Sequence, residues 1–120
     1  MKKALIVEDH PDMVEILTLQ LERLGFAVVS ASNGKAGVEK AIKEKPNLIL
    51  MDIMMSVMDG REATRIIRSK KNTKNIPILA TTAMTEKSQL RECIEAGCND
   101  YLVKPFSPKE LASHIEKLLV

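Results

Sequence analysis

The 120-residue chain is poor in aromatic side chains, which make up 2% of it and include no tryptophan. This scarcity argues against a platform on which nucleic-acid bases stack. A core must instead be built from isoleucine, leucine, valine, methionine and alanine. Hydrophobic residues amount to 45% of the chain, so enough of them are present for an ordinary folded domain.

Long apolar runs, a paired-cysteine motif and a strong charge excess are also missing. The first apolar run, Ala4–Val7, is too short for a signal peptide or a membrane span, so no membrane association is expected. A net charge of +2 does not indicate nucleic-acid binding. Cys93 and Cys98 fit neither a redox pair nor a zinc knuckle, and as buried reduced thiols they are typical of a cytoplasmic protein.

Five apolar runs alternate with five amphipathic patterns, and no linker or repeat interrupts them. This alternation predicts one domain over residues 1–120, an α/β fold with a doubly wound parallel sheet and helices on both faces. The expected strands are Ala4–Val7, Ala27–Val29, Leu48–Met51, Ile76–Ala80 with Thr81 and Thr82, and Tyr101–Val103. The expected helices are Pro11–Leu24, a helix capped by Asn33 with Val38, Ala41 and Ile42 facing inward, one following Asp59-Gly60, Thr85–Ala96, and one opened by a Ser107–Glu110 capping box.

Polar side chains stand where these strands end. A buried apolar run leads straight into Asp52, Glu8 and Asp9 follow the first strand, Thr82 ends the fourth, and Lys104 follows the fifth. The carboxyl ends of parallel strands meet at one edge of the sheet, where open α/β sheets bind ligands. Each residue alone has an ordinary explanation, such as an aspartate that caps the next turn. Together they predict three carboxylates facing one hydroxyl and one ammonium group.

Such a cluster suits a metal ion and a phosphoryl group. At an effective dielectric constant of 20, two carboxylates ~5 Å apart repel by about 3 kcal/mol. A divalent cation relieves this repulsion, and ligands that are all oxygen favour Mg²⁺. One carboxylate can then attack phosphorus, as in the aspartyl phosphates of covalent catalysis. Thr82 and Lys104 offer a hydroxyl and a positive charge to the phosphoryl oxygens.

With these residues in this order, the whole chain resembles the receiver domain of bacterial two-component response regulators. The resemblance makes Asp52 the phosphoacceptor, Glu8 and Asp9 the metal-binding acids, and Met54 the donor of a backbone carbonyl to Mg²⁺. The further matches are the Asp59-Gly60 turn, the switch hydroxyl with its small neighbour at Thr82-Ala83, the switch aromatic Tyr101, and Lys104-Pro105-Phe106, whose Lys-Pro bond is cis in the family.

The resemblance implies a flavodoxin-like fold of strand order 2-1-3-4-5 and a role in two-component signalling. A sensor histidine kinase or a phosphotransfer protein would pass a phosphoryl group to Asp52 with the help of Mg²⁺. The chain would be a phosphoacceptor with its own phosphorylation and dephosphorylation chemistry rather than an enzyme. Phosphorylation would pull Thr82 inward, let Tyr101 move, and change the surface of the fourth helix, fifth strand and fifth helix for a downstream target protein.

One departure and several alternatives accompany this interpretation. The family usually has proline where Ser56 stands, so a looser loop and weaker switching are expected. His10 and His114 look isolated and structural or exposed. The alternatives are a docking module without phosphoryl chemistry, a Mg²⁺-dependent phosphatase, which lacks a second acid at Met54, and a flavin-binding relative, which an acidic first loop disfavours. A single-domain regulator, which the Met1 start slightly favours, and a receiver from a longer protein both fit. The kinase, the target and the oligomeric state stay open.

Overall fold

The sheet of the computed structural model, which describes residues 1–119, has five parallel strands in the order β2-β1-β3-β4-β5. This confirms the predicted fold class and strand order. The strands are β1 (Lys2–Val7), β2 (Phe26–Ala31), β3 (Leu48–Asp52), β4 (Ile78–Thr82) and β5 (Asp100–Val103). The helices are α1 (Pro11–Arg23), α2 (Gly34–Glu44), α3 (Gly60–Ser69), α4 (Lys87–Ala96) and α5 (Pro108–Leu119).

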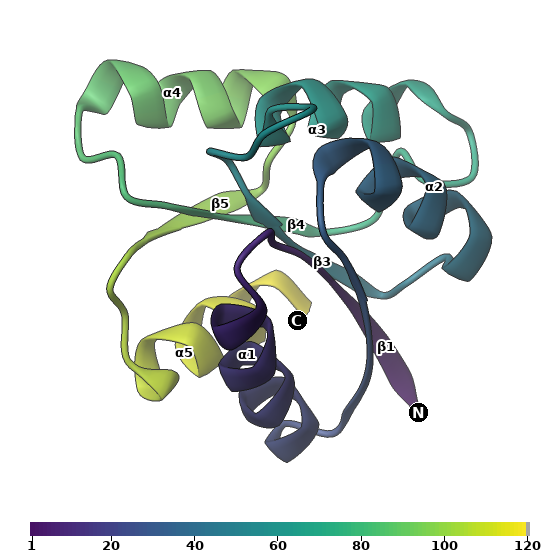
Figure 1. Cartoon of the computed structure of the whole chain (residues 1–120), viewed down its shortest axis with the longest axis vertical. Helices are drawn as coiled ribbons and strands as arrows, with labels where there is room; N and C mark the ends of the chain where they lie inside the picture. Colours follow the sequence, from purple (N-terminus) through teal and green to yellow (C-terminus); the bar gives the residue numbers. More distant parts are fainter. Residues whose placement is uncertain (120) are drawn as a thin grey trace.

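The helices form two layers around this sheet. Helices α1 and α5 cover one face, and α2, α3 and α4 cover the other (Figure 1). Each face has its own apolar core, one around Leu17, Leu50 and Leu111 and one around Ile49, Met51 and Ile67. Strand β3 lies in the middle of the sheet, and all five of its residues are buried. Its last residue, Asp52, is therefore held by packing from both faces.

Local sequence signals place the starts of α2 and α5 as predicted. The Asn33 side chain accepts a hydrogen bond of 2.8 Å from the Ala36 backbone N–H and so caps α2. At α5 the Glu110 N–H donates to Ser107 Oγ and the Ser107 N–H donates to a Glu110 carboxylate oxygen, both at 3.1 Å. These two bonds are the capping box.

Several predicted bounds and one predicted core residue differ from the structure. Ile42 is 41% exposed rather than inward-facing, because it lies one residue beyond the buried Ala41 and the helix turns its side chain toward solvent. Strands β1 and β2 run longer, since Lys2 and Ser30 keep the extended pairing although their side chains are exposed. Helix α4 begins at Lys87, two residues after the predicted start. Within residues 1–119, none of the helices has the length and apolar character needed to traverse a bilayer.

Candidate functional site

The predicted acidic residues meet Lys104 at the carboxyl edge of the sheet. Glu8 follows β1, Asp52 ends the neighbouring β3, and Lys104 follows β5. The Lys104 ammonium nitrogen lies 2.9 Å from Glu8 Oε1 and 3.4 Å from Asp52 Oδ1. Glu8 is 2% exposed and Asp52 4% exposed, so both carboxylates are nearly removed from solvent. Residues 8, 52 and 104, far apart in the sequence, thus form one buried ionic cluster.

Two further side chains complete this cluster. Single ligand atoms of Glu8, Asp9, His10 and Asp52 all lie within 4.8 Å of one another. His10 Nδ1 is 3.1 Å from Glu8 Oε2 and 3.0 Å from Asp9 Oδ1. The sequence suggested that His10 and His114 are isolated and structural or exposed. His10 is exposed, but neither histidine is isolated, because His114 Nδ1 lies 2.6 Å from Asp100 Oδ2. The Glu8-Asp9-His10 sequence itself is the signal that could have revealed the contacts of His10, because three adjacent residues after a strand share one edge.

The ionic contacts shift the pKa values of the two buried carboxylates in opposite directions. Burial by itself raises the pKa of Glu8, but hydrogen bonds from Lys104 and His10 outweigh it and lower that pKa to about 2. Burial raises the pKa of Asp52 to about 6, since the charge of Lys104 offsets it only in part and the charge of Glu8 adds to it. Burial opposes the charge of Lys104, yet its hydrogen bond to Glu8 and the charge of Asp52 raise its pKa overall. Lys104 therefore stabilises mainly the negative charge of Glu8, and the negative charge of Asp52 is less well stabilised.

Neutralising Asp52 is expected to stabilise the metal-free protein. The folded-state pKa of about 6 lies above the ordinary 3.8. The buried charge of Asp52 therefore lowers the free energy of unfolding by its full amount above pH of about 6 and not at all below about 4. Asp52→Asn should raise the free energy of unfolding by about 2 kcal/mol at pH 7 and by little at pH 4. Urea titrations with a chelator measure this, with the exposed Glu39→Gln as control. No gain at neutral pH would contradict a crowded carboxylate cluster.

Of the two predicted switch residues, Thr82 bonds to the backbone of Lys104, and Tyr101 lies on the adjoining strand β5. Thr82 ends β4 fully buried, and its hydroxyl accepts a hydrogen bond of 3.0 Å from the Met84 N–H. Its carbonyl accepts a bond of 2.7 Å from the Lys104 N–H, which ties the ends of β4 and β5 together. Tyr101 pairs with Ala80 across the same two strands and is half-buried against the core that α3 and α4 cover. The peptide bond from Lys104 to Pro105 is cis, as the resemblance implied.

The loop after Asp52 departs from regular geometry at Val57. Met58 N–H donates to the Ser56 carbonyl at 2.8 Å, and this tight turn holds Val57 at a φ of 70°. Positive φ is costly for a β-branched residue. Val57 is 77% exposed and Met54 62% exposed, so the loop presents apolar side chains to solvent next to the cluster.

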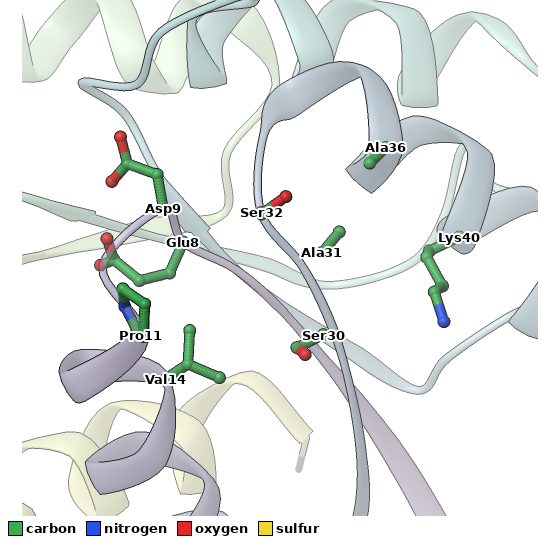
Figure 2. A pocket seen from close by; sticks show the side chains of 9 residues that line it. All are labelled: Glu8, Asp9, Pro11, Val14, Ser30, Ala31, Ser32, Ala36 and Lys40. Carbon is green, nitrogen blue, oxygen red and sulfur yellow. The ribbon is translucent and has the colours of Figure 1, made fainter.

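A pocket of about 510 Å³ opens beside Glu8 and Asp9. Figure 2 shows these two carboxylates at one end, Pro11 and Val14 of α1 below them, and Lys40 of α2 at the opposite end. Its walls are mixed in character, because Ser30 and Ser32 alternate with apolar residues. The pocket gives solvent and small ions a route to the acidic side of the cluster.

Comparisons with known proteins identify the family of this chain. The family model described as "Response regulator receiver domain" matches residues 4–116. Over 118 residues the chain is 39% identical to the alkaline phosphatase synthesis transcriptional regulatory protein PhoP of Bacillus subtilis, covering 98% of this chain and 48% of PhoP. The chain thus spans about half the length of the curated relatives it matches.

Two solved structures share the fold closely. Chemotaxis response regulator CheY4 of Vibrio cholerae has a TM-score of 0.94 and 31% identity, with 99% of both chains covered. The receiver domain of sensor histidine kinase PA1611 from Pseudomonas aeruginosa has a TM-score of 0.91 and 36% identity, with 98% of this chain and 97% of that chain covered. That receiver domain was solved with a magnesium ion coordinated in its active site cleft.

Proposed function

Because this chain belongs to the response regulator receiver domain family of two-component systems, we propose that Asp52 accepts a phosphoryl group from a phosphohistidine. The donor would be a sensor histidine kinase or a phosphotransfer protein. The observation that carries the proposal is the buried Asp52 carboxylate at the end of β3, with the Lys104 ammonium group 3.4 Å away. The receiver family is a signalling family and not a family of ordinary enzymes. We also propose that the receiver domain comprises residues 1–120, a little more than the 4–116 that the family model matches.

In the proposed transfer an Asp52 oxygen attacks the phosphorus atom. A P–O bond forms, the P–N bond of the phosphohistidine breaks, and the imidazole leaves with the electron pair and takes a proton from solvent. With a pKa of about 6, Asp52 is mostly ionised near neutral pH and so can act as the nucleophile. Lys104 is placed to neutralise charge on the phosphoryl oxygens, and hydrolysis of the acyl phosphate restores the carboxylate.

The acidic side of the cluster fits Mg²⁺. Asp9 Oδ1 is buried and accepts no hydrogen bond from the described residues, although the exposed His10 ring lies 3.0 Å away. An oxygen that lacks a donor next to two other carboxylates is what a hard cation requires. We propose that Asp9, Asp52 and the Met54 carbonyl bind the ion, with Glu8 supporting it. Mg²⁺ bound there would supply positive charge to the phosphoryl oxygens.

The output of the switch would be the surface formed by α4, β5 and α5. Phosphorylation would draw the Thr82 hydroxyl away from the Met84 N–H and leave space that Tyr101 can fill. The phosphoryl group shifts this equilibrium only through contacts that differ between the two states. A downstream target protein would read the new surface. We place these events in the cytoplasm, where Cys93 and Cys98 stay reduced, and expect no direct contact of the receiver with nucleic acid, given its net charge of +2.

Intact mass after treatment with a small acyl phosphate and Mg²⁺ tests the proposed function. The parent chain should gain the mass of one phosphoryl group, and Asp52→Asn should gain none. Asp59→Asn is a matched control, since Asp59 caps α3 outside the ionic cluster and should leave the mass gain intact. An unmodified parent chain would indicate a docking module without phosphoryl chemistry. Equal modification of Asp52→Asn would show that another residue is the acceptor.

The phosphoryl group on Asp52 is expected to last minutes or longer. Met54 and Met84 follow the ends of β3 and β4 by two residues each, where we expect them to flank it. Neither side chain offers a polar group that would orient an attacking water. Replacing Met54 by asparagine adds such a group and should shorten the lifetime. Decay of the phosphorylated mass after rapid removal of the acyl phosphate measures both lifetimes. A parent lifetime of a few seconds would contradict this prediction.

A further inference from the structure

Lysines gather at the edge of the sheet opposite the ionic cluster. Between Glu62 and Glu86 the chain has five basic residues and no acidic one. Three of them, Lys70, Lys71 and Lys74, lie exposed in the turn between α3 and β4. Within residues 1–119 none of these three lysines forms an ion pair with a carboxylate. The turn therefore presents three positive charges to solvent without internal compensation.

Hydrogen bonds fix the backbone of this turn. Thr73 is 1% exposed, and its hydroxyl donates a bond of 2.7 Å to the Ile67 carbonyl. The Lys74 N–H donates to the Lys70 carbonyl at 2.9 Å, and the Arg68 guanidinium donates to the Lys74 carbonyl at 3.0 Å. A partner would thus meet charges on an ordered backbone, which reduces the conformational entropy lost on binding.

The end of α2 enlarges this charged surface. Helices α2 and α3 each lead from the carboxyl end of one parallel strand to the amino end of another, and they pack together on one face of the sheet (Figure 1). Both helices therefore end at the amino edge of the sheet. Lys43 and Lys45 are exposed there, while Glu44 between them already pairs with Lys3 at 2.7 Å. The lysine surface is defined here as Lys43, Lys45, Lys70, Lys71 and Lys74.

We propose that the lysine surface docks an acidic segment of a protein partner, whose carboxylates face the lysines. The acids of the ionic cluster lie at the other edge, so the net charge of +2 conceals a separation of charge that orients such a segment. Ile42, 41% exposed just before Lys43, offers an apolar contact beside the charges. The inference does not rest on the proposed function, because the docked segment would leave Asp52 accessible.

The composition of the lysine surface favours an acidic protein over other polyanions. Arginine forks are the preferred partners of nucleic-acid phosphates, and Arg68, the nearest arginine, is engaged with the carbonyls of Gly97, Lys74 and Ile76. Ammonium groups act as point charges and accept carboxylates from many directions. A membrane surface would also require several large apolar side chains for insertion, whereas Ile42 alone is exposed beside these lysines.

Fluorescence anisotropy with a labelled peptide of repeated Glu-Glu-Leu-Glu units tests the proposal. The parent chain should bind it, with an affinity that decreases as salt increases. A triple variant with Lys70→Glu, Lys71→Glu and Lys74→Glu should bind about 10-fold or more weakly. Replacing the same three lysines by glutamine should give an intermediate loss. Circular dichroism checks that both variants fold, which we expect because the three side chains are exposed.

The chain offers a control with the same change in net charge. Three exposed lysines begin helices at the carboxyl edge, and their replacement gives the control variant Lys35→Glu, Lys87→Glu and Lys109→Glu. The molecule measures 29 Å along its shortest axis, whereas charges are screened beyond about 8 Å at physiological salt. The control should therefore bind the peptide within about 3-fold of the parent.

Equal losses in the two glutamate variants would overturn the proposal, because only net charge would then matter. Tighter binding of duplex DNA or of phosphatidylserine vesicles than of the peptide, also abolished by the lysine substitutions, would assign the surface to another polyanion. Saturating peptide should leave the mass gain from acyl phosphate and Mg²⁺ unchanged, and a blocked gain would place the peptide at the wrong edge. A parent that gains no mass even without peptide contradicts the proposed function alone.

Discussion

Replacing Lys104 by methionine is expected to cost the metal-free protein about 3 kcal/mol of unfolding free energy at pH 7. Glu8 is 2% exposed and would lose the ammonium group 2.9 Å away, leaving a buried charge that keeps only the contacts of His10, its backbone N–H and its exposed ring. The pKa of Glu8 is about 2, below its ordinary 4.5, so the stabilisation is complete above pH of about 4.5 and fades as pH falls toward 2.

Urea titrations with a chelator at pH 7 and pH 4 measure this effect. The loss should be largest at pH 7 and shrink at pH 4, because an unpaired Glu8 takes up a proton there. Lys71→Met, at an exposed position, is the control. In the double variant Lys104→Met with Asp52→Asn the two changes should be non-additive, since Asp52 and Glu8 both contact the ammonium nitrogen of Lys104. Equal stability of Lys104→Met and the parent would mean that Lys104 does not compensate Glu8.

Gly60→Ala is the second substitution with a large expected effect, a loss of about 3 kcal/mol. Gly60 is the first residue of α3, and its N–H bonds to the Ile53 carbonyl at 2.9 Å. A Cβ at this position would collide with the Asp52 carbonyl oxygen and would lie 2.8 Å from Ile53 Cα. Both obstacles are backbone, which cannot rotate away. Helix propensity alone would favour alanine by up to about 1 kcal/mol, so the collision reverses the sign.

The collision should also disturb the site, because it displaces the backbone of Asp52, the proposed phosphoacceptor. Thermal or urea unfolding measures the stability, and Mg²⁺ affinity of the folded variant measures the displacement of Asp52. The control is Glu62→Ala, an exposed residue in the same helical turn. A Gly60→Ala protein as stable as the parent would show that α3 can move away from β3 without cost.

Sequence patterns were sufficient where a local rule decides the structure. The cap at Asn33 and the box at Ser107 and Glu110 satisfy their own backbone groups, so their neighbours in sequence identify them. Ile42 shows the limit of helical periodicity, because α2 buries a narrower face than the pattern indicated. Strand order depends on long-range pairing, and it came from the resemblance to a family and not from the spacing of residues.

For the site, the sequence predicted which side chains meet at one edge of the sheet. It did not predict which of them pair with each other. It put Lys104 opposite the phosphoacceptor, whereas the shorter contact of Lys104 is to Glu8. Differences of half an ångström depend on how β1 and β5 twist relative to each other, which no local pattern encodes. The role of Met54 as a carbonyl donor stays a prediction.

The half-buried Tyr101 gives the chain a built-in optical reporter. It is the only tyrosine, and no tryptophan is present to dominate its emission. It lies on β5 two residues before the end of that strand and packs against the core that α3 and α4 cover. Tyrosine fluorescence of the unlabelled protein therefore originates at the position proposed to move, and its intensity and quenching by iodide can follow the switch in real time.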